Sequence, residues 1–511
     1  MSNPEKVLII GEHPIKESIR NQFVQQECEI TEVPGLTESV LQIPWRDIVV
    51  LSSADNDADA IKTVETFAES ISDVSTIRPT VHLLLQSQES LRLLSTREYN
   101  DEWHRRFELN AFTIEDLWAK NVLCQNYVDY RFPGLDYKPI TFESNDVVHF
   151  VVFGLSNLTI ALAEHAALVA HYPNYTRNHS LRTRITIIDN NMSEWSQKFI
   201  SMHKPLMENS YYRYIDIAKQ QCDLHKPMYE GLREDFVDVE WEFVSGAIHD
   251  LVVQDKLQGW ADDENQVLSV ALCHNDDSTN LSEATLIADL LCNQAIPVYV
   301  KQSTSVMRDI VSQSPRMKNV IMVGMEDCGY DINLPLLKMA KRVNSVYEYC
   351  YNNNIASETE GCITAPSYID DKDADACWLN VRKAIKRYSN ICNAMALATK
   401  MRSLGHSVDK IDTFYAITKQ EIDVIAEVEH NRWNVEEMLL GFRPCTDEEQ
   451  ADIEADISKK GEYKNRLVHY DLRAYKDLRA DDTGKNVNTY DICLSASIPL
   501  IAYQGEKGGD V

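Results

Sequence analysis

The chain has 511 residues, which at the usual domain size predicts three or four folded units rather than a single core. Hydrophobic residues make up 44% of the sequence and charged residues 25%, as in ordinary globular proteins, but the formal net charge is −29. A surface this acidic repels phosphate backbones and anionic lipid, which argues against nucleic acid or a membrane surface as the partner.

The sequence also indicates a compartment. The first six residues contain no apolar segment, and the most apolar later window, Thr159 to Val169, is interrupted by Glu164 and His165. The 12 cysteines are scattered singly with no Cys-x-x-Cys pair, so neither a zinc ribbon nor a disulfide framework is expected. We therefore expect a cytoplasmic protein with no direct membrane insertion.

The first unit, over residues 1–137, alternates short apolar strands with helices. The run from Val7 to Ile10 ends at Gly11, and a helix is expected from Ile15 to about Gln25. Further strands are expected from Ile30 to Val33, Asp47 to Leu51 and Thr80 to Leu85, before an amphipathic segment from Phe112 to Val122. This alternation predicts a Rossmann-like domain. It keeps only Gly11 of a glycine fingerprint, and Glu12 would repel a diphosphate, so a structural role is expected.

The second unit, over residues 145–338, contains the clearest pattern in the chain. An apolar run from Val147 to Phe153 ends at Gly154 and passes into an Ala- and Leu-rich segment of helical length. A second apolar strand then ends on Asp189. Strand, glycine turn, helix, strand and terminal carboxylate form the βαβ half of a dinucleotide-binding fold.

The same unit is expected to continue as a nearly complete doubly wound sheet. A long helical and polar stretch follows Asp189. Four more strands are then expected, at Val237 to Val244, Val267 to Leu272, Val298 to Val300 and Asn319 to Val323, with a helix from Ser282 to Leu291. The ligand crevice of such a sheet lies at the carboxyl ends of its strands.

Five residues at these strand ends are candidates for a nucleotide site, namely Gly154, Ser156, Asn157, Asp189 and His274. Asp189 could accept a hydrogen bond from a ribose 2′-hydroxyl. It follows Gly154 by 189 − 154 = 35 residues, against about 20 in the usual motif, and Thr159 replaces the last glycine of the fingerprint. A bound adenine nucleotide or NAD-type ligand and an unliganded scaffold both fit this pattern.

Two enzymatic alternatives involve the same residues. The segment from Gly154 to Leu158 begins like the nucleophile elbow of hydrolases, but it lacks the second glycine of that turn, so Ser156 is not expected to be a nucleophile. An NAD(H)-dependent oxidoreductase would need a proton donor beside the nicotinamide, and no Tyr-x-x-x-Lys pair is placed to provide one.

The remaining chain is predicted to be helical. Residues 339–418 carry large aromatic anchors such as Trp378 and are expected to form a connector with its own packing. A strong helix is expected from Lys419 to Leu440, with Gly441 as its left-handed C-cap, in a domain over residues 419–503. Residues 504–511 are expected to form a flexible tail.

The last domain holds the densest group of polar and aromatic candidates. They are Glu427, His430, Arg432, Trp433, Arg466, His469 and Tyr475. An indole with guanidinium and imidazole donors close by suits a purine ring and its phosphates. The alternative is that Trp433 and His430 are core residues and the arginines neutralise nearby carboxylates. Glu427 and His430 also have a metal-ligand spacing, but the second copy that a di-metal bundle needs is missing, so no metal is expected.

These residues carry a resemblance to a known family. The segments from Glu427 to Trp433, Gly441-Phe442 and Arg466 to Leu472, with Tyr475 and Leu478, resemble the RyR domain of ryanodine receptors and of many bacterial proteins. Phe442, Tyr470 and Ala474 depart from the family pattern, where tryptophan, proline and proline stand, and the acidic insert from Asp447 to Glu462 is longer than expected. The region upstream is similar to the TrkA-type nucleotide-binding domain that often precedes this module. The resemblance implies a ligand sensor without catalytic residues.

The sequence thus predicts an α/β protein with two tandem Rossmann-like parallel-sheet domains, a helical connector and a small, mainly α RyR domain. The predicted function is a non-enzymatic, homodimeric nucleotide sensor that acts by conformational change, in ion-transport regulation or in antiphage or stress signalling. Its expected partners are a small nucleotide-type ligand and a protein such as a transporter or defence effector. A purely structural subunit that docks on such a protein is the third alternative.

Overall fold

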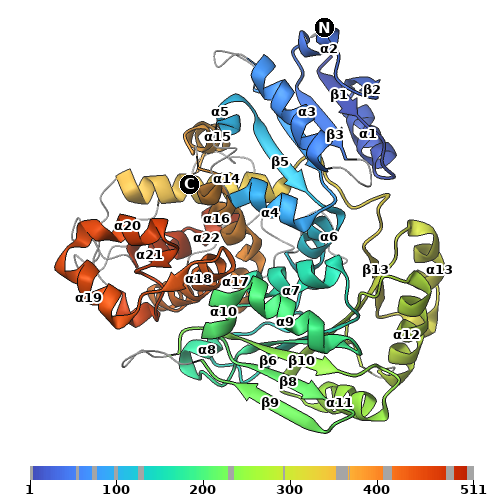
Figure 1. Ribbon diagram of the computed structural model, residues 1–511, viewed down its shortest axis with the longest axis vertical. Helices are drawn as coiled ribbons and strands as arrows, with labels where there is room; N and C mark the ends of the chain where they lie inside the picture. Colours follow the sequence, from blue (N-terminus) through green and yellow to red (C-terminus); the bar gives the residue numbers. More distant parts are fainter. Residues whose placement is uncertain are drawn as a thin grey trace.

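Runs of β-branched and aliphatic residues form two large, mainly parallel β-sheets, and most of the other elements are helices (Figure 1). The computed structural model describes residues 4–52, 57–71, 78–96, 102–124, 132–227, 235–291, 294–352, 366, 369–381, 383–406, 417–478 and 488–502. The expected tail over residues 504–511 lies outside this set. No helix within it is long and apolar enough to cross a membrane.

The first sheet has five parallel strands in the order β2-β1-β3-β4-β5. They are β1 (Lys6–Ile10), β2 (Glu29–Val33), β3 (Asp47–Leu51), β4 (Thr80–Leu84) and β5 (Glu108–Phe112). Its helices are α1 (Lys16–Gln25), α2 (Glu38–Leu41), α3 (Asp57–Ser70), α4 (Gln88–Thr96), α5 (Trp103–Arg106) and α6 (Ile114–Leu123). Four of the strands and α1 confirm the prediction, and the strand order is the flavodoxin-like one. The fifth strand was not predicted because only its two ends are buried, while its middle residues, Leu109 to Ala111, are half-buried.

The second sheet has eight strands in the order β13-β12-β11-β6-β7-β10-β8-β9. They are β6 (Val147–Phe153), β7 (Thr183–Asp189), β8 (Tyr212–Asp216), β9 (Gln221–His225), β10 (Val239–Ser245), β11 (Gln266–Leu272), β12 (Val298–Lys301) and β13 (Val320–Val323). Without β8 and β9, the order is that of a doubly wound dinucleotide-binding sheet, 3-2-1-4-5-6, and it reverses between β6 and β11. The predicted Rossmann-like sheet is therefore confirmed.

The hairpin of β8 and β9 corrects the sequence prediction of a helical and polar stretch. It is antiparallel and extends the sheet beyond β10. Four of the five residues of β9 are exposed, and Arg213 of β8 forms ion pairs with Glu240 and Glu242 of β10. An edge strand with little buried surface has no apolar run, so its residues are as polar as those of a surface helix.

The central helices cover both faces of this sheet. They are α7 (Asn157–Val169), α8 (Asn174–Arg177), α9 (Met192–Met202), α10 (Lys204–Asn209), α11 (Leu251–Asp262), α12 (Asp277–Leu290) and α13 (Arg308–Ser312), with short 3-10 turns at Ser305–Met307 and Pro315–Met317. Of these, α7 is buried along most of its length, including Leu158 and Leu162. This explains why its sequence is almost uniformly apolar.

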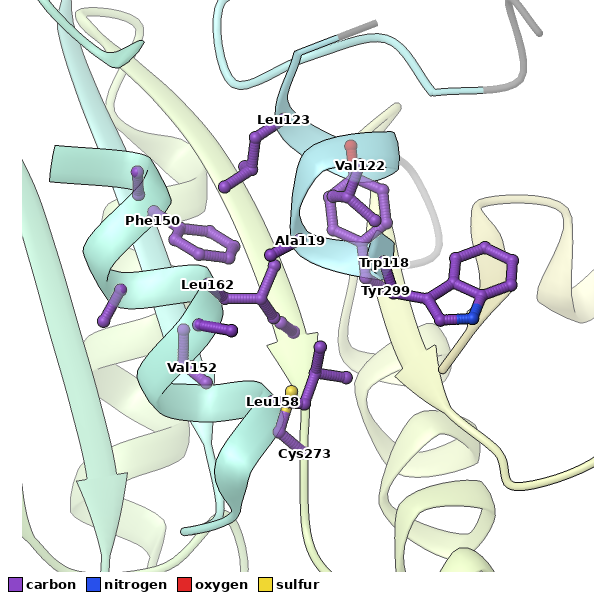
Figure 2. Packing of buried hydrophobic residues seen from close by; sticks show 14 of the residues in the cluster. Trp118, Ala119, Val122, Leu123, Phe150, Val152, Leu158, Leu162, Cys273 and Tyr299 are labelled. Carbon is purple, nitrogen blue, oxygen red and sulfur yellow. The ribbon is translucent and has the colours of Figure 1, made fainter. Parts of the chain in front are cut away.

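The two sheet units share one hydrophobic core. Figure 2 shows Ala119 of α6 next to Leu162 of α7. The chain after β13 also returns to the first unit. There, Tyr330 stacks on Phe112, with ring centroids 4.2 Å apart, and its hydroxyl lies 2.7 Å from His82 Nδ1. Trp118 Nε1 donates to the carbonyl of Met325 at 2.9 Å.

The rest of the chain forms a helical bundle. Its helices are α14 (Pro335–Asn352), α15 (Asp371–Leu379), α16 (Ala384–Met395), α17 (Leu397–Ser403), α18 (Lys419–Leu439), α19 (Asp447–Ala455), α20 (Lys460–Asn465), α21 (Thr489–Ala496) and α22 (Ile498–Ala502), with 3-10 turns at Ile457–Lys459 and Tyr475–Asp477. Two short strands, β14 (Arg443–Pro444) and β15 (Val468–His469), pair beside them. One core joins α14 to α18 and α21, so the segment expected to be a connector packs with the last domain.

The longest helix, α18, has the ends that its sequence predicts. At its start, Thr418 and Glu421 form a reciprocal capping box. At its end, Gly441 has a φ of +95°, and the amide of Phe442 donates to the carbonyl of Glu437.

Candidate functional site

The order of the central sheet reverses where the loops after β6 and β11 meet. Gly154 follows β6 with a φ of +87°, and a Cβ atom at this position would lie 2.6 Å from the backbone nitrogen of His274. Only glycine fits both this backbone conformation and this contact. The structure thus brings two of the predicted residues, Gly154 and His274, directly together.

His274 is held in place by α12. The side chain of Asn280 accepts from the amide of His274 at 2.8 Å and donates to its carbonyl at 2.9 Å. His274 Nε2 lies 2.9 Å from Glu283 Oε2. This hydrogen bond, together with the charges of Glu283, Asp189 and Asp276, raises the pKa of His274 even though burial opposes it. The imidazole is therefore protonated more readily than a free histidine side chain.

The other three predicted residues lie on the same edge of the sheet. Ser156 is the N-cap of α7, and its amide donates to Thr159 Oγ1 at 3.2 Å. Thr159, which replaces the last fingerprint glycine, also donates to the carbonyl of Gly154 at 2.8 Å. The first turn of α7 presents Asn157 to solvent. Asp189 ends β7, where its Oδ1 accepts from the amide of Asn191 at 2.8 Å. A helix N-terminus, an imidazole and a carboxylate thus lie at the same end of the central sheet.

The second candidate group lies on one side of α18. The rings of His430 and Trp433 are stacked with centroids 5.5 Å apart, and Trp433 meets His469 edge-on at 4.9 Å. Tyr475 lies 5.8 Å from His430. His430 Nε2 donates to the carbonyl of Arg473 at 3.0 Å. Four of the predicted residues are therefore close together, and His430 stacks against the indole that was expected to stack on a purine.

Burial controls the protonation of this cluster. It lowers the pKa of His469 well below its usual value, and Lys464, which donates to His469 Nε2 at 3.0 Å, lowers it further. Burial also raises the pKa of Glu427, and it raises that of Glu437 to about 7. The neutral forms of His469, Glu427 and Glu437 are thus favoured, and Lys464 is the cation that lies next to the ring of His469.

The two predicted arginines are engaged elsewhere. Arg432 is 1% exposed and forms ion pairs with Glu429 at 2.8 Å and Glu436 at 2.5 Å. Arg466 is exposed and lies over the ring of Tyr463, 5.2 Å from its centroid. For Arg432, the alternative interpretation from the sequence, neutralisation of neighbouring carboxylates, describes the structure.

Comparisons with family models, with curated proteins and with solved structures found no match to this chain. The function is therefore argued from the geometry of the two sites. Within the described parts of the chain, no group of three or more His, Cys, Asp and Glu side chains is arranged to hold a metal ion.

Sequence reasoning missed the two residues that hold His274 in place. Asn280 and Glu283 hold His274 from the first turns of α12, six and nine residues later in the chain. The helix after β11 was expected to begin at Ser282, so Asn280 was placed outside it. A polar side chain just inside a helix, directly after a strand end, is the signal that could have identified it.

Proposed function

We propose that the protein is a nucleotide-sensing regulator whose central sheet binds an adenine-nucleotide or NAD-type ligand between the ends of β6, β7 and β11. The observation that carries the proposal is the reversal of strand order at Gly154, because open α/β sheets bind ligands at such switch points. The same end of the sheet also carries the N-terminus of α7, which suits a diphosphate, and the carboxylate of Asp189, which suits a ribose hydroxyl. No catalytic group is assigned.

Each part of the ligand would meet a different element. The diphosphate would lie over the first turn of α7, at Ser156 and Asn157, where helix amides favour negative charge. His274 in its cationic form would add a charge-assisted hydrogen bond. Asp189 would accept from a ribose hydroxyl. The proposed ligand is therefore recognised mainly through its diphosphate and ribose.

The position of α7 supports a regulatory role. This helix packs against α6 of the first unit and against α16 and α18 of the bundle, so a change at its N-terminus reaches all parts of the molecule. A ligand that binds better to one position of α7 would shift the equilibrium between conformations of the whole chain. We expect such a regulator to act as a homodimer in the cytoplasm, on a protein such as a transporter or effector.

Calorimetry with ATP, ADP, NAD and ADP-ribose tests the proposal. At least one of them should bind, and Asp189→Ala should weaken that binding at least tenfold. Asp263→Ala is a matched control, because Asp263 Oδ1 also accepts from the amide two residues later, at Asn265, but on an exposed loop outside the crevice. No heat with any of the four ligands, or equal losses in the two variants, would refute the proposal.

The C-terminal cluster is a second candidate for the ligand site. Its support is the partly exposed Trp433, which has His469 at its edge and Lys464 behind that ring. The variant Trp433→Leu distinguishes the two candidate sites. If Trp433→Leu loses nucleotide binding and Asp189→Ala does not, the ligand binds at α18. Oxidation of added NADH by the wild-type protein would instead favour the oxidoreductase alternative.

A further inference from the structure

A cavity of about 200 Å³ lies where the first unit, the central unit and the helical bundle meet. Its walls come from α4, β5 and α6, from α7, and from α14, α15, α16 and the end of α18. Most of its lining is apolar. Representative residues are Leu91, Leu117, Leu168, Tyr388, Ile391 and Leu439. It lies apart from both candidate sites, since none of their predicted residues lines it.

Except for Asp331, the charged residues in the walls are paired with one another. Arg92 donates to Glu164 at 2.6 Å across the contact between α4 and α7. Asp116 accepts from Lys120 and lies close to His165, at 2.8 Å in each case. In the wall formed by β5 and α16, Arg387 pairs with Glu108 at 2.7 Å. An anionic or cationic ligand would have to break one of these pairs, which disfavours a charged occupant.

Three buried histidines also line the cavity. They are His104, His165 and His203. The Nδ1 atom of each has no hydrogen-bond partner among the residues that the structure describes. Burial lowers the pKa of His104 to about 3, so this imidazole is neutral. A buried polar atom without a partner is costly, and a ligand that bonds to it recovers that cost.

We propose that this cavity binds an uncharged heteroaromatic molecule of about the size of a nucleobase. A dry cavity of roughly 150 Å³ accommodates benzene, so this larger volume suits a bicyclic ring. Trp378 and Tyr388 offer aromatic surface, and the Nδ1 atoms of the three histidines would form hydrogen bonds with ring nitrogens. This inference does not depend on the nucleotide site proposed above, because the ligand differs in charge and the residues differ.

Occupancy of this cavity would hold the three units together. A ligand that binds only the assembled state stabilises it by mass action. Adenine should therefore raise the melting temperature of the full-length chain as its concentration increases. Benzoate, which is of similar size but anionic, should bind at least tenfold more weakly.

The test is calorimetry of the full-length protein with adenine. Ser95→Phe, at a half-buried position of α4 in the cavity wall, should weaken binding at least tenfold by filling the space. Ser193→Phe, the same change at an exposed position of α9, and Asp189→Ala should bind adenine like the wild type. If Ser95→Phe does not fold, Leu117→Phe in the α6 wall replaces it.

Three outcomes would overturn the proposal. They are the absence of adenine binding, equal binding by Ser95→Phe and Ser193→Phe, and benzoate binding as tight as that of adenine. A loss of adenine binding in Asp189→Ala would likewise place the ligand in the crevice of the central sheet. None of these outcomes bears on whether a nucleotide diphosphate binds there.

Discussion

In the proposed nucleotide site, His274 would make ligand binding depend on pH. The pKa of His274 in the folded protein is raised, mainly by the hydrogen bond to Glu283. The positive charge of the imidazole is therefore present at a pH below the ordinary histidine pKa, and it is lost as the pH rises through the raised pKa. Binding of NAD or ADP-ribose, whose diphosphates do not titrate in this range, should therefore weaken as the pH rises. Loss of a hydrogen bond from a charged group costs about 1.5–3 kcal/mol, or on the order of ten- to a hundredfold in Kd.

Calorimetry between pH 6 and 8.5 measures this dependence. His274→Gln should abolish most of it and bind at all pH values as the wild type does at high pH. His249→Gln is the control, since His249 is exposed and lies 4.0 Å from the same carboxylate, Glu283. If the pH dependence survives in His274→Gln, His274 does not contact the anion.

Gly154 is the second residue whose role can be isolated. In Gly154→Ala the new Cβ would meet His274 at 2.6 Å in a left-handed backbone conformation, and such strain costs about 1–3 kcal/mol before the steric overlap is added. Thermal melting should therefore show a clear loss of stability. Gly259→Ala, in an exposed turn of α11 with nothing within 4 Å of the new Cβ, should instead stabilise the protein by about 0.5–1 kcal/mol. Equal melting temperatures for the two variants would contradict the assigned role of Gly154.

At the scale of elements, the buried carboxylate of Glu108 joins β5 to α15 and α16. Glu108 accepts from Trp378 Nε1 at 2.9 Å and pairs with Arg387, 279 residues later in the chain. Burial lowers the pKa of Arg387 to about 10, so the guanidinium is still charged at neutral pH. Glu108→Gln would leave this charge buried without a counterion, at a cost of about 3–5 kcal/mol.

Chemical denaturation would measure that loss. The control is Glu208→Gln, which breaks an exposed pair with Lys204 and should change stability by less than about 1 kcal/mol. Replacing both partners, as Glu108→Leu with Arg387→Met, should recover much of the loss, because no unpaired charge is then buried. If Glu108→Gln and Glu208→Gln have equal effects, this pair does not join β5 to the bundle.

The same elements show what the sequence could predict. Strands buried on both faces, such as β6 and β11, are continuous apolar runs, and their ends were predicted to within one residue. The edge strands β5 and β9 were missed because their exposed or half-buried residues carry no periodic signal. Gly154 and Asp189 were predicted from their positions after or at the end of apolar strands, and the structure places both at strand ends. The burial of Arg432 between Glu429 and Glu436, and the attachment of Glu108 to Arg387, depend on packing that local sequence does not encode.

At the scale of the whole molecule, α7 could connect the proposed nucleotide site to the other units. It begins next to Gly154 and packs against α6, α16 and α18. Hydrogen exchange with and without NAD should therefore show added protection at residues 154–160 and also in α6 and α18, which contact α7 directly. The exposed hairpin of β8 and β9 is the internal control, since it belongs to the same sheet but lies at its far edge and should not change. Protection confined to the loops around Gly154, Asp189 and His274 would mean that the ligand binds without altering the assembly. A regulatory role through α7 would then be excluded.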